Sequence, residues 1–368
     1  MKTAITELFD IQHPILNAGM GRIAYPEMVI AVCNAGGLGV YGAGSNPPER
    51  VREDIRRIRA ATDRPFGINA PLALPNAMEN VKIALEEEVP VINYSMGRGD
   101  WIVKRARTYG GKVMASVNSV KLAVSAQKHG ADAVIAAGHE AAGHAGDITT
   151  FVLVPRLAEL LDIPIIAAGG VANGAGLVGA LALGAEGVSM GTRMLLTNEG
   201  VVHDNFKQRA VESDVDRTLY SNKFDGHMCR VLNTPGPERI YNGKQSLNPV
   251  SIFLQSFGIA RELEQPYLKM FSDVLRKGPK ETFAMMRMAR MLKMGTLARD
   301  TGDLEHGQCG AGMSVGLVHD IPSIAEVIER VVAEAEESFG RLAGLMERDV
   351  VAREAAAAAG RSISSAAA

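Results

Sequence analysis

The sequence is poor in cysteine and in aromatic residues, and it carries no marked excess of either charge. Three cysteines, Cys33, Cys229 and Cys309, are spread over 368 residues without a CxxC pair. This argues against a disulfide framework and a structural zinc site, and it favours a reducing cytoplasm. Lys and Arg number 39 against 41 Asp and Glu, a formal net charge of −2. No strong field therefore attracts nucleic acid or an anionic membrane.

Long apolar runs are also missing. The first nine residues lack the apolar stretch of a signal peptide, and no uncharged apolar run reaches the roughly 20 residues that a membrane span needs. Apolar residues make up 47% of the chain and charged residues 22%, the mixture of an ordinary globular protein. We therefore expect a cytoplasmic protein with neither a membrane nor a nucleic-acid partner.

Short apolar runs alternate with helical patterns from the N-terminus onward. Such alternation is typical of a parallel sheet with helices on both faces. Eight units favour a closed (β/α)8 TIM barrel in the α/β class, with an open doubly wound sheet as the alternative. The expected strands are residues 13–17, 38–41, 66–69, 89–94, 112–117, 133–137, 164–168 and 187–190, and the expected helices include 48–60, 76–87, 119–129, 150–161 and 174–183.

The pattern changes after Val215, where polar, turn-rich sequence begins. Several helices are expected within residues 248–294. The last of them, 280–294, alternates Met with Arg and Lys, which fits either core packing or a lid over an acyl-thioester. The expected organisation is a barrel at 1–215, an inserted helical cap at 216–305, a return segment with a long helix (324–347) at 306–350, and a low-complexity tail, frayed at its end, at 351–368.

Two glycine-containing loops follow the last two expected strands. Gly169 and Gly170 end the seventh strand, and Gly191, Thr192 and Arg193 follow the eighth. Glycines let backbone N–H groups approach a phosphate, and the positive end of the helix after the first loop favours an anion. Loops after strands seven and eight are the usual phosphate site of such barrels. We predict a phosphate site here, with plain βα turns as the alternative.

The loop after the sixth strand, residues 138–146, holds His139, Glu140 and His144 among Gly and Ala. An imidazole titrates near neutrality and can bind or move a proton. A metal site would need the three side chains to converge, and HExxxH is not the helical HExxH spacing. We predict a catalytic or substrate-orienting His, with a metal site and a plain solvent-facing loop as alternatives.

Two further signals are weaker. Residues 37–42 match GxGxxG, but the glycines straddle a strand instead of opening a helix, which disfavours dinucleotide binding there. Asn69 ends the third strand, where its amide could meet the edge of a heterocycle. An Asx turn before Pro71 explains Asn69 equally well.

Seven stretches together resemble the nitronate monooxygenase family, formerly called 2-nitropropane dioxygenases. These are FMN-dependent (β/α)8 enzymes related to NAD(P)H:quinone reductases and FMN-type enoyl-[acyl carrier protein] reductases. Two departures are a Glu-Ala-Ala-Gly-His loop in place of Glu-Ala-Gly-Gly-His, and the long insertion 216–294. The matching stretches are residues 13–20, 34–39, 65–69, 140–144, 167–170, 190–193 and 312–317.

The resemblance implies roles for individual residues. It makes His144 the catalytic residue and places substrate near His139 and Met20. Ser116 stands where some quinone-reductase relatives have Lys. The residues implied to bind FMN are Gly169, Gly170, Gly191 and Thr192 at the phosphate, and Ala18, Gly19, Met20, Asn69, Ser116 and Gly143 around the ring.

The resemblance favours oxidation of alkyl nitronates with O2 through a flavin semiquinone. The alternative is an NAD(P)H-dependent reductase of quinones or of enoyl-thioesters carried on CoA or acyl carrier protein. A non-catalytic flavin-binding barrel is a third hypothesis. A homodimer through the cap would fit any of the three, and no metal is expected.

Overall fold

A sheet of eight parallel strands forms the centre of the computed structural model, which describes residues 1–44, 46–244, 287 and 290–366. The strands run in the order β1-β8-β7-β6-β5-β4-β3-β2, and a bridge between Leu16 and Leu38 brings β2 back to β1. The sheet therefore curls into the expected (β/α)8 barrel, and the open sheet is excluded. The strands are β1 Ile15–Asn17, β2 Gly39–Gly42, β3 Phe66–Pro71, β4 Val91–Ser95, β5 Lys112–Val117, β6 Ala133–Ala137, β7 Ile165–Ala168 and β8 Gly187–Met190.

An asparagine side chain completes the junction between β1 and β2. The fully buried Asn17 amide donates to the Val40 carbonyl oxygen at 2.9 Å, and its Oδ1 accepts from the Val40 N–H at 2.8 Å. One side chain thus supplies both bonds that a neighbouring strand would give. This satisfies backbone groups that would otherwise be buried without partners.

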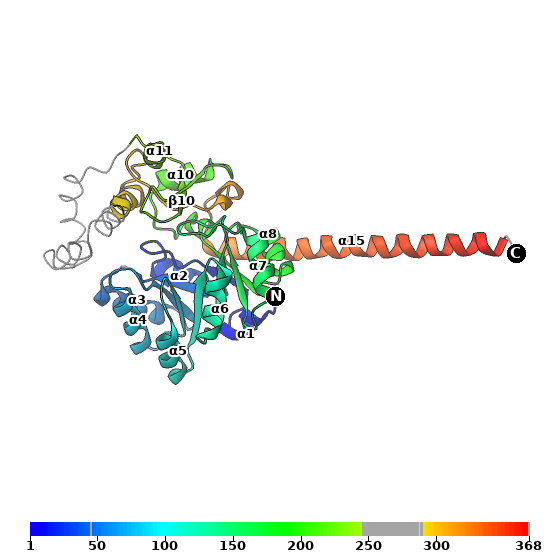
Figure 1. Ribbon diagram of the computed structural model, residues 1–368, viewed down its shortest axis with the longest axis horizontal. Helices are drawn as coiled ribbons and strands as arrows, with labels where there is room; N and C mark the ends of the chain where they lie inside the picture. The colour runs from blue at the N-terminus through cyan, green and yellow to red at the C-terminus, as the bar shows by residue number, and fades with distance from the viewer. Residues whose placement is uncertain (45, 245–286, 288–289, 367–368) are drawn as a thin grey trace.

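The helices lie outside the barrel, as expected for βα units (Figure 1). Five of them fall within a few residues of the predicted ranges. They are α3 Pro48–Ala61, α4 Ala77–Glu86, α6 Val120–Lys128, α7 Thr150–Ala158 and α8 Gly174–Ala182, joined by α1 Ala4–Phe9, α2 Pro26–Asn34 and α5 Asp100–Ala106.

Two hydrophobic layers hold the barrel together. The inner layer combines strand residues such as Leu16, Val91 and Ile166 with Ile5 and Phe9, so α1 closes one end of the barrel. The outer layer lies between strands and helices and is built mainly from Val, Ile, Leu and Ala. Because both faces of each strand are covered, the strands read as continuous apolar runs.

The chain after the barrel adds a smaller layer above it (Figure 1). This layer contains α9 Thr192–Leu195, α10 Asp204–Val211, the antiparallel hairpin of β9 Thr218–Ser221 and β10 Cys229–Leu232, and α11 Pro235–Tyr241. Residues 290–296 are helical and end in a π-helical turn, Leu297–Thr301. The rest of the helices predicted in 248–294 lies outside the described residues.

The last helix, α15 Ile324–Ala366, begins where predicted but continues well past residue 347. Its first turns bury Val327, Ile328 and Val331 against α2 and α8, and the remainder projects away from the barrel (Figure 1). The prediction that this helix ends at 347 was therefore wrong. The long run of alanines continues the helix because Ala has the highest helix propensity.

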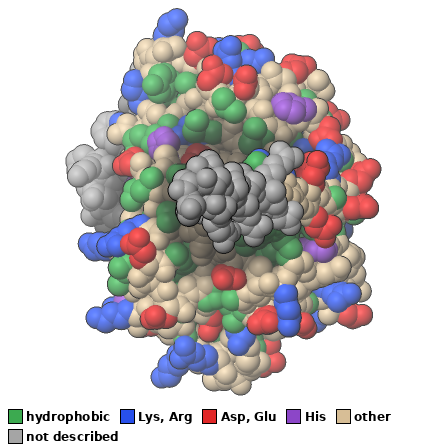
Figure 2. All heavy atoms as spheres, turned by 90° about the vertical axis from the view of Figure 1, so that its right-hand side faces the viewer, with side chains coloured by type: hydrophobic (Ala, Val, Ile, Leu, Met, Phe, Trp, Pro, Cys, Tyr) green, Lys and Arg blue, Asp and Glu red, His purple; other side chains and the backbone are tan. Residues whose placement is uncertain are grey.

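Acidic and basic side chains are interspersed on the face around α15 (Figure 2). This agrees with the near-zero net charge. Among the described residues, no helix combines the length and apolar character needed to cross a membrane.

Candidate active site

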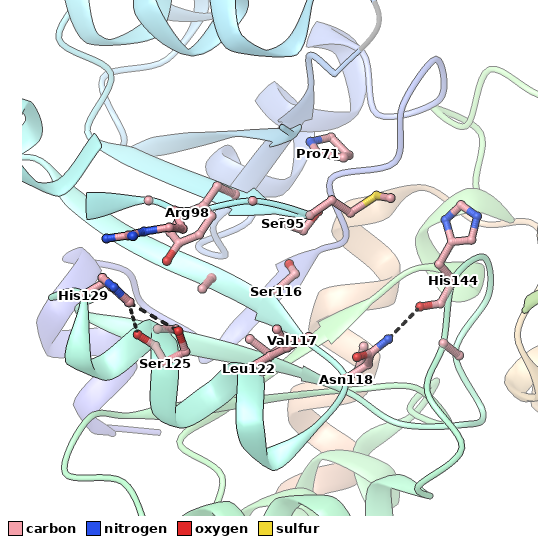
Figure 3. Close-up of a pocket in the computed structure, with 18 of the residues that line it drawn as sticks. Pro71, Ser95, Arg98, Ser116, Val117, Asn118, Leu122, Ser125, His129 and His144 are labelled. Carbon is pink, nitrogen blue, oxygen red and sulfur yellow. Dashed lines mark hydrogen bonds between the residues drawn. The ribbon is translucent and has the colours of Figure 1, made fainter. Parts of the chain in front are cut away.

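A cavity of about 480 Å³ opens near the carboxyl-terminal ends of β3 to β6 (Figure 3). Two predicted site residues, Ser116 on β5 and His144 in the β6–α7 loop, contribute to its wall. The volume is typical of a small-molecule site, and this end of the barrel is where such folds carry their chemistry.

His144 forms a short hydrogen bond with a carboxylate from the layer above the barrel. Its Nε2 lies 2.6 Å from Oδ2 of Asp225, which is 1% exposed, whereas His144 is 39% exposed at its side chain. The other Asp225 oxygen accepts the His227 N–H at 2.9 Å. Burial alone would raise the pKa of Asp225, but the hydrogen bond and charge of His144, followed by the His227 N–H, lower it below its ordinary value.

The hairpin that carries Asp225 is fastened to the His144 loop. Gly143 and Arg230 exchange backbone hydrogen bonds of 3.1 and 2.9 Å. The buried Arg230 guanidinium donates to the His139 carbonyl oxygen and lies over the Tyr220 ring at 5.0 Å. Gly143 has a φ of 67°, a conformation that favours glycine. The loop and the hairpin thus form one unit that fixes the His144–Asp225 pair.

The other two ionisable residues of this loop, Glu140 and His139, form hydrogen bonds within the protein. The Glu140 carboxylate accepts from both the N–H and the hydroxyl of Thr150, at the start of α7, so it caps that helix. His139 Nδ1 lies 3.0 Å from the Gly146 carbonyl oxygen, and its ring packs edge-on against Tyr220. Because the three side chains have different partners, the metal alternative for His139, Glu140 and His144 is not supported.

Cys229 Sγ lies within 4.8 Å of the His144 and Asp225 ligand atoms. Burial raises the pKa of this thiol to about 12, so it is protonated near neutral pH. The thiol therefore lies beside the His144–Asp225 pair without adding a charge to it.

Asn69 and the turn after β1 form a polar contact at the end of β3. The Asn69 amide donates to the Gly19 carbonyl oxygen at 2.6 Å, while its buried Oδ1 has no partner among the described residues. A Cβ on Gly19 would lie 2.2 Å from that of Asn69, so this turn requires glycine. Ala18 and Met20 continue the turn, whose Ala18 N–H donates to the Met190 carbonyl oxygen. An unpaired buried acceptor beside a glycine fits the polar edge of a flavin ring.

The Ser116 side chain forms a hydrogen bond with a polar residue of the neighbouring strand. Its hydroxyl donates to Oδ1 of the buried Asn93 at 3.1 Å. Ser116 also lines the cavity with His144, so the structure brings these two predicted residues to one site. Neither glycine loop lines this cavity, among the residues described.

The two glycine loops lie side by side because β7 and β8 pair directly. Gly169 and Gly170 have φ values of 100° and 81°, which only glycine adopts without strain. The Thr192 hydroxyl accepts the Gly312 N–H at 2.9 Å, which ties the second loop to the returning chain. This geometry fits a phosphate held by backbone N–H groups next to Gly191.

Two neighbours of these loops have other partners. The Gly174 N–H in the first turn of α8 already has an acidic partner, because it donates to the Glu334 carboxylate at 2.8 Å. Arg193 is buried, and its guanidinium is paired with Asp320 at 2.8 Å and with the Leu196 carbonyl oxygen. Both groups instead fasten the C-terminal segment.

Comparison with known proteins identifies the family of this chain. The sequence profile described as nitronate monooxygenase matches residues 2–334. The chain belongs to the nitronate monooxygenase family. This makes it an enzyme, an oxidoreductase of a family that uses FMN.

Three known proteins match this chain, two of them over most of its length and one over a smaller part. A (3aS,4S,5R,7aS)-5-hydroxy-7a-methyl-1-oxo-octahydro-1H-indene-4-carboxyl-CoA dehydrogenase of Mycobacterium tuberculosis is 32% identical, over 94% of this chain and 99% of its own. A probable nitronate monooxygenase of Staphylococcus aureus is 30% identical, over 63% of this chain and 78% of its own. The structure of FabK from Thermotoga maritima aligns with a TM-score of 0.78 and 35% identity, over 94% and 99%.

Asp225 is the functional candidate that the sequence did not reveal. It lies 81 positions from His144, in a turn-rich segment without a motif. A buried Asp beside a hairpin is visible only once β9 and β10 are placed above the barrel.

Proposed function

We propose that this family member oxidises alkyl nitronates with O2, with His144 binding the nitronate oxygens. The observation that carries the proposal is the 2.6 Å pair between His144 and the buried Asp225 at the cavity wall. In this proposal the Nε2–H donates to Asp225, and a second N–H at Nδ1 would donate to a nitronate oxygen. Hydrogen bonds to an ionised acceptor are the strong ones, so an anionic nitronate suits this donor.

The residues present fit FMN. The unpaired Oδ1 of Asn69 and the Ala18-Gly19-Met20 turn suit its ring, and Gly169, Gly170, Gly191 and Thr192 suit its phosphate. Ser116 and Gly143 are proposed as further contacts. When bound, FMN supplies the redox chemistry.

The protein's own residues orient the substrate. Asp225 occupies the Nε2 side of His144, so Nδ1 is the ring nitrogen that faces away from the carboxylate. Fixing one nitrogen sets the role of the other. His144 then holds the nitronate through Nδ1, with Met20 and His139 proposed to lie near it.

A second function is favoured by how much of this chain each relative matches. The coenzyme A thioester dehydrogenase matches 94% of this chain, including the region of the insertion, whereas the staphylococcal relative matches 63%. A CoA or acyl-carrier-protein thioester, or a quinone, could then exchange hydride with FMN, with NAD(P)H as co-substrate.

An anaerobic titration of the purified flavoprotein separates the two functions. Loss of the visible flavin absorbance on adding propionate 3-nitronate, without a response to NADH or NADPH, would support nitronate oxidation. Bleaching by a nicotinamide would instead support the reductase. His144→Ala should lose nitronate turnover by about 100-fold or more, and the exposed His306→Ala serves as the control. Full nitronate turnover in His144→Ala would exclude the proposed role.

We also propose a cytoplasmic location. The three cysteines are free and buried, which suits a reducing compartment. The homodimer remains a prediction from the sequence.

A further inference from the structure

The cavity at His144 extends beyond the reacting end of a small nitronate. Besides Ser116 and His144, its wall includes Leu122, Ser125 and His129, which follow one another along α6, and Arg98 in the loop before α5 (Figure 3). At about 480 Å³ it has the volume of a drug-sized ligand site. Ser116, proposed above as an FMN contact, belongs to one part of this wall, whereas the residues on and after α6 are not among those proposed for FMN.

Large apolar side chains stand around this cavity without being buried. Met96 is 44% exposed, Leu122 is 49% exposed and Met228 is 39% exposed, and all three belong to the cavity wall. They come from three separate segments: the loop after β4, helix α6 and the hairpin turn beside Asp225. Apolar surface gathered at a cavity is typical of a ligand groove.

Two local features keep the groove open. Helix α6 buries only alanines, Ala123 and Ala126, against the barrel, and Ala126 lines the cavity together with Ala115 of β5. Small side chains at these positions leave width between helix and strand.

Met96 has a φ of 53°, an uncommon conformation for a residue other than glycine. Such strain persists where the surroundings fix a functional side chain.

We propose that this groove, lined by Met96, Leu122, Met228, Ala115 and Ala126, binds a long aliphatic tail of the substrate. The anionic head of the substrate lies at His144 and the tail runs along α6. The preferred substrate is then a nitronate with a medium-length alkyl chain. This inference rests on the proposed function for the position of the head.

The polar residues at the far end of the cavity wall are compatible with this placement. His129 Nδ1 lies 2.6 Å from the Ser125 carbonyl oxygen, and Arg98 pairs with Asp100. Their polar groups have partners within the protein, so the tail need not supply any.

Straight-chain alkanoates test the groove without requiring turnover, because their carboxylate resembles the planar anionic nitronate head. Calorimetric titration of the FMN-loaded protein with butanoate, hexanoate, octanoate and decanoate gives affinity against chain length. Each methylene that is fully buried adds about fourfold to affinity. We expect at least a tenfold gain from butanoate to decanoate.

A charge placed in the groove should remove that gain. Leu122→Glu is expected to flatten the chain-length dependence and to leave butanoate affinity within about twofold. The matched control is Val124→Glu, on the same helix and 44% exposed, which should keep the wild-type slope.

A flat series in the wild-type protein, or equal slopes in Leu122→Glu and Val124→Glu, would overturn the groove. Failure of the proposed function gives a different result. The chain-length gain would persist while His144→Ala kept its turnover, or while nitronates failed to bleach the flavin.

Discussion

The imidazole of His144 and the carboxylate of Asp225 meet at 2.6 Å although one belongs to the barrel and the other to the layer above it. The contact is made possible by the paired backbones of Gly143 and Arg230. Family membership accounts for the barrel, whereas the catalytic role of His144 stays a proposal. The buried Asp225 holds the His144 ring in one orientation at the cavity wall.

Replacing Asp225 by Asn tests this relationship while keeping the shape of the side chain. Loss of the negative charge should lower kcat/KM for a nitronate by about 10- to 100-fold. The His144 ring then loses the ionised acceptor that fixes its Nε2 side. Asp216→Asn, whose side chain is 76% exposed, is the control and should match the wild type. An unchanged kcat/KM in Asp225→Asn would contradict the role.

The same carboxylate should make stability depend on pH. The folded protein holds the pKa of Asp225 below its ordinary value of 3.8, so the pair stabilises the fold at pH values above that range. This stabilisation is lost as pH falls through the lowered pKa. The difference in unfolding free energy between wild type and Asp225→Asn should therefore be largest near neutral pH and shrink toward pH 2. Urea unfolding at several pH values measures it, and a difference that grows with acidity would contradict it.

Sequence reasoning located the barrel because each strand is an apolar run buried on both faces. Ranges such as residues 112–117 and 133–137 coincide with β5 and β6. It also named Ser116 and His144, which share one cavity because Ser116 lies near the end of β5 and His144 follows β6 at the same face of the barrel.

What the sequence could not supply are pairings between distant segments. Arg193 looked available to a phosphate, but its partner Asp320 lies 127 positions away. Glu334 reaches the first turn of α8 across 160 positions. Local pattern carries no information on such contacts. Similarly, Glu140 caps α7 because the loop folds back onto Thr150, which a spacing rule for metal ligands does not describe.

Asn69 should matter for FMN binding more than for folding. Asn69→Ala removes the donor to Gly19 and the unpaired Oδ1. A lost hydrogen bond to a buried polar partner costs about 1–2 kcal/mol, so we expect the FMN Kd to rise by about tenfold. Quenching of flavin fluorescence on adding apoprotein measures it. The exposed Asn198→Ala should bind as the wild type does, and an unchanged Kd in Asn69→Ala would remove Asn69 from the flavin site.

Asn17 should contribute to stability without taking part in catalysis, because its amide joins β1 to β2 through both polar groups of Val40. Asn17→Ala leaves a buried N–H and a buried carbonyl oxygen without partners, and each such group costs about 1–3 kcal/mol. The free energy of unfolding should therefore fall by about 2–5 kcal/mol in urea titrations. Asn198→Ala, at an exposed position, should change it by less than about 0.5 kcal/mol. If Asn17→Ala were as stable as that control, the junction between β1 and β2 would depend on the Leu16–Leu38 bridge and not on the side chain.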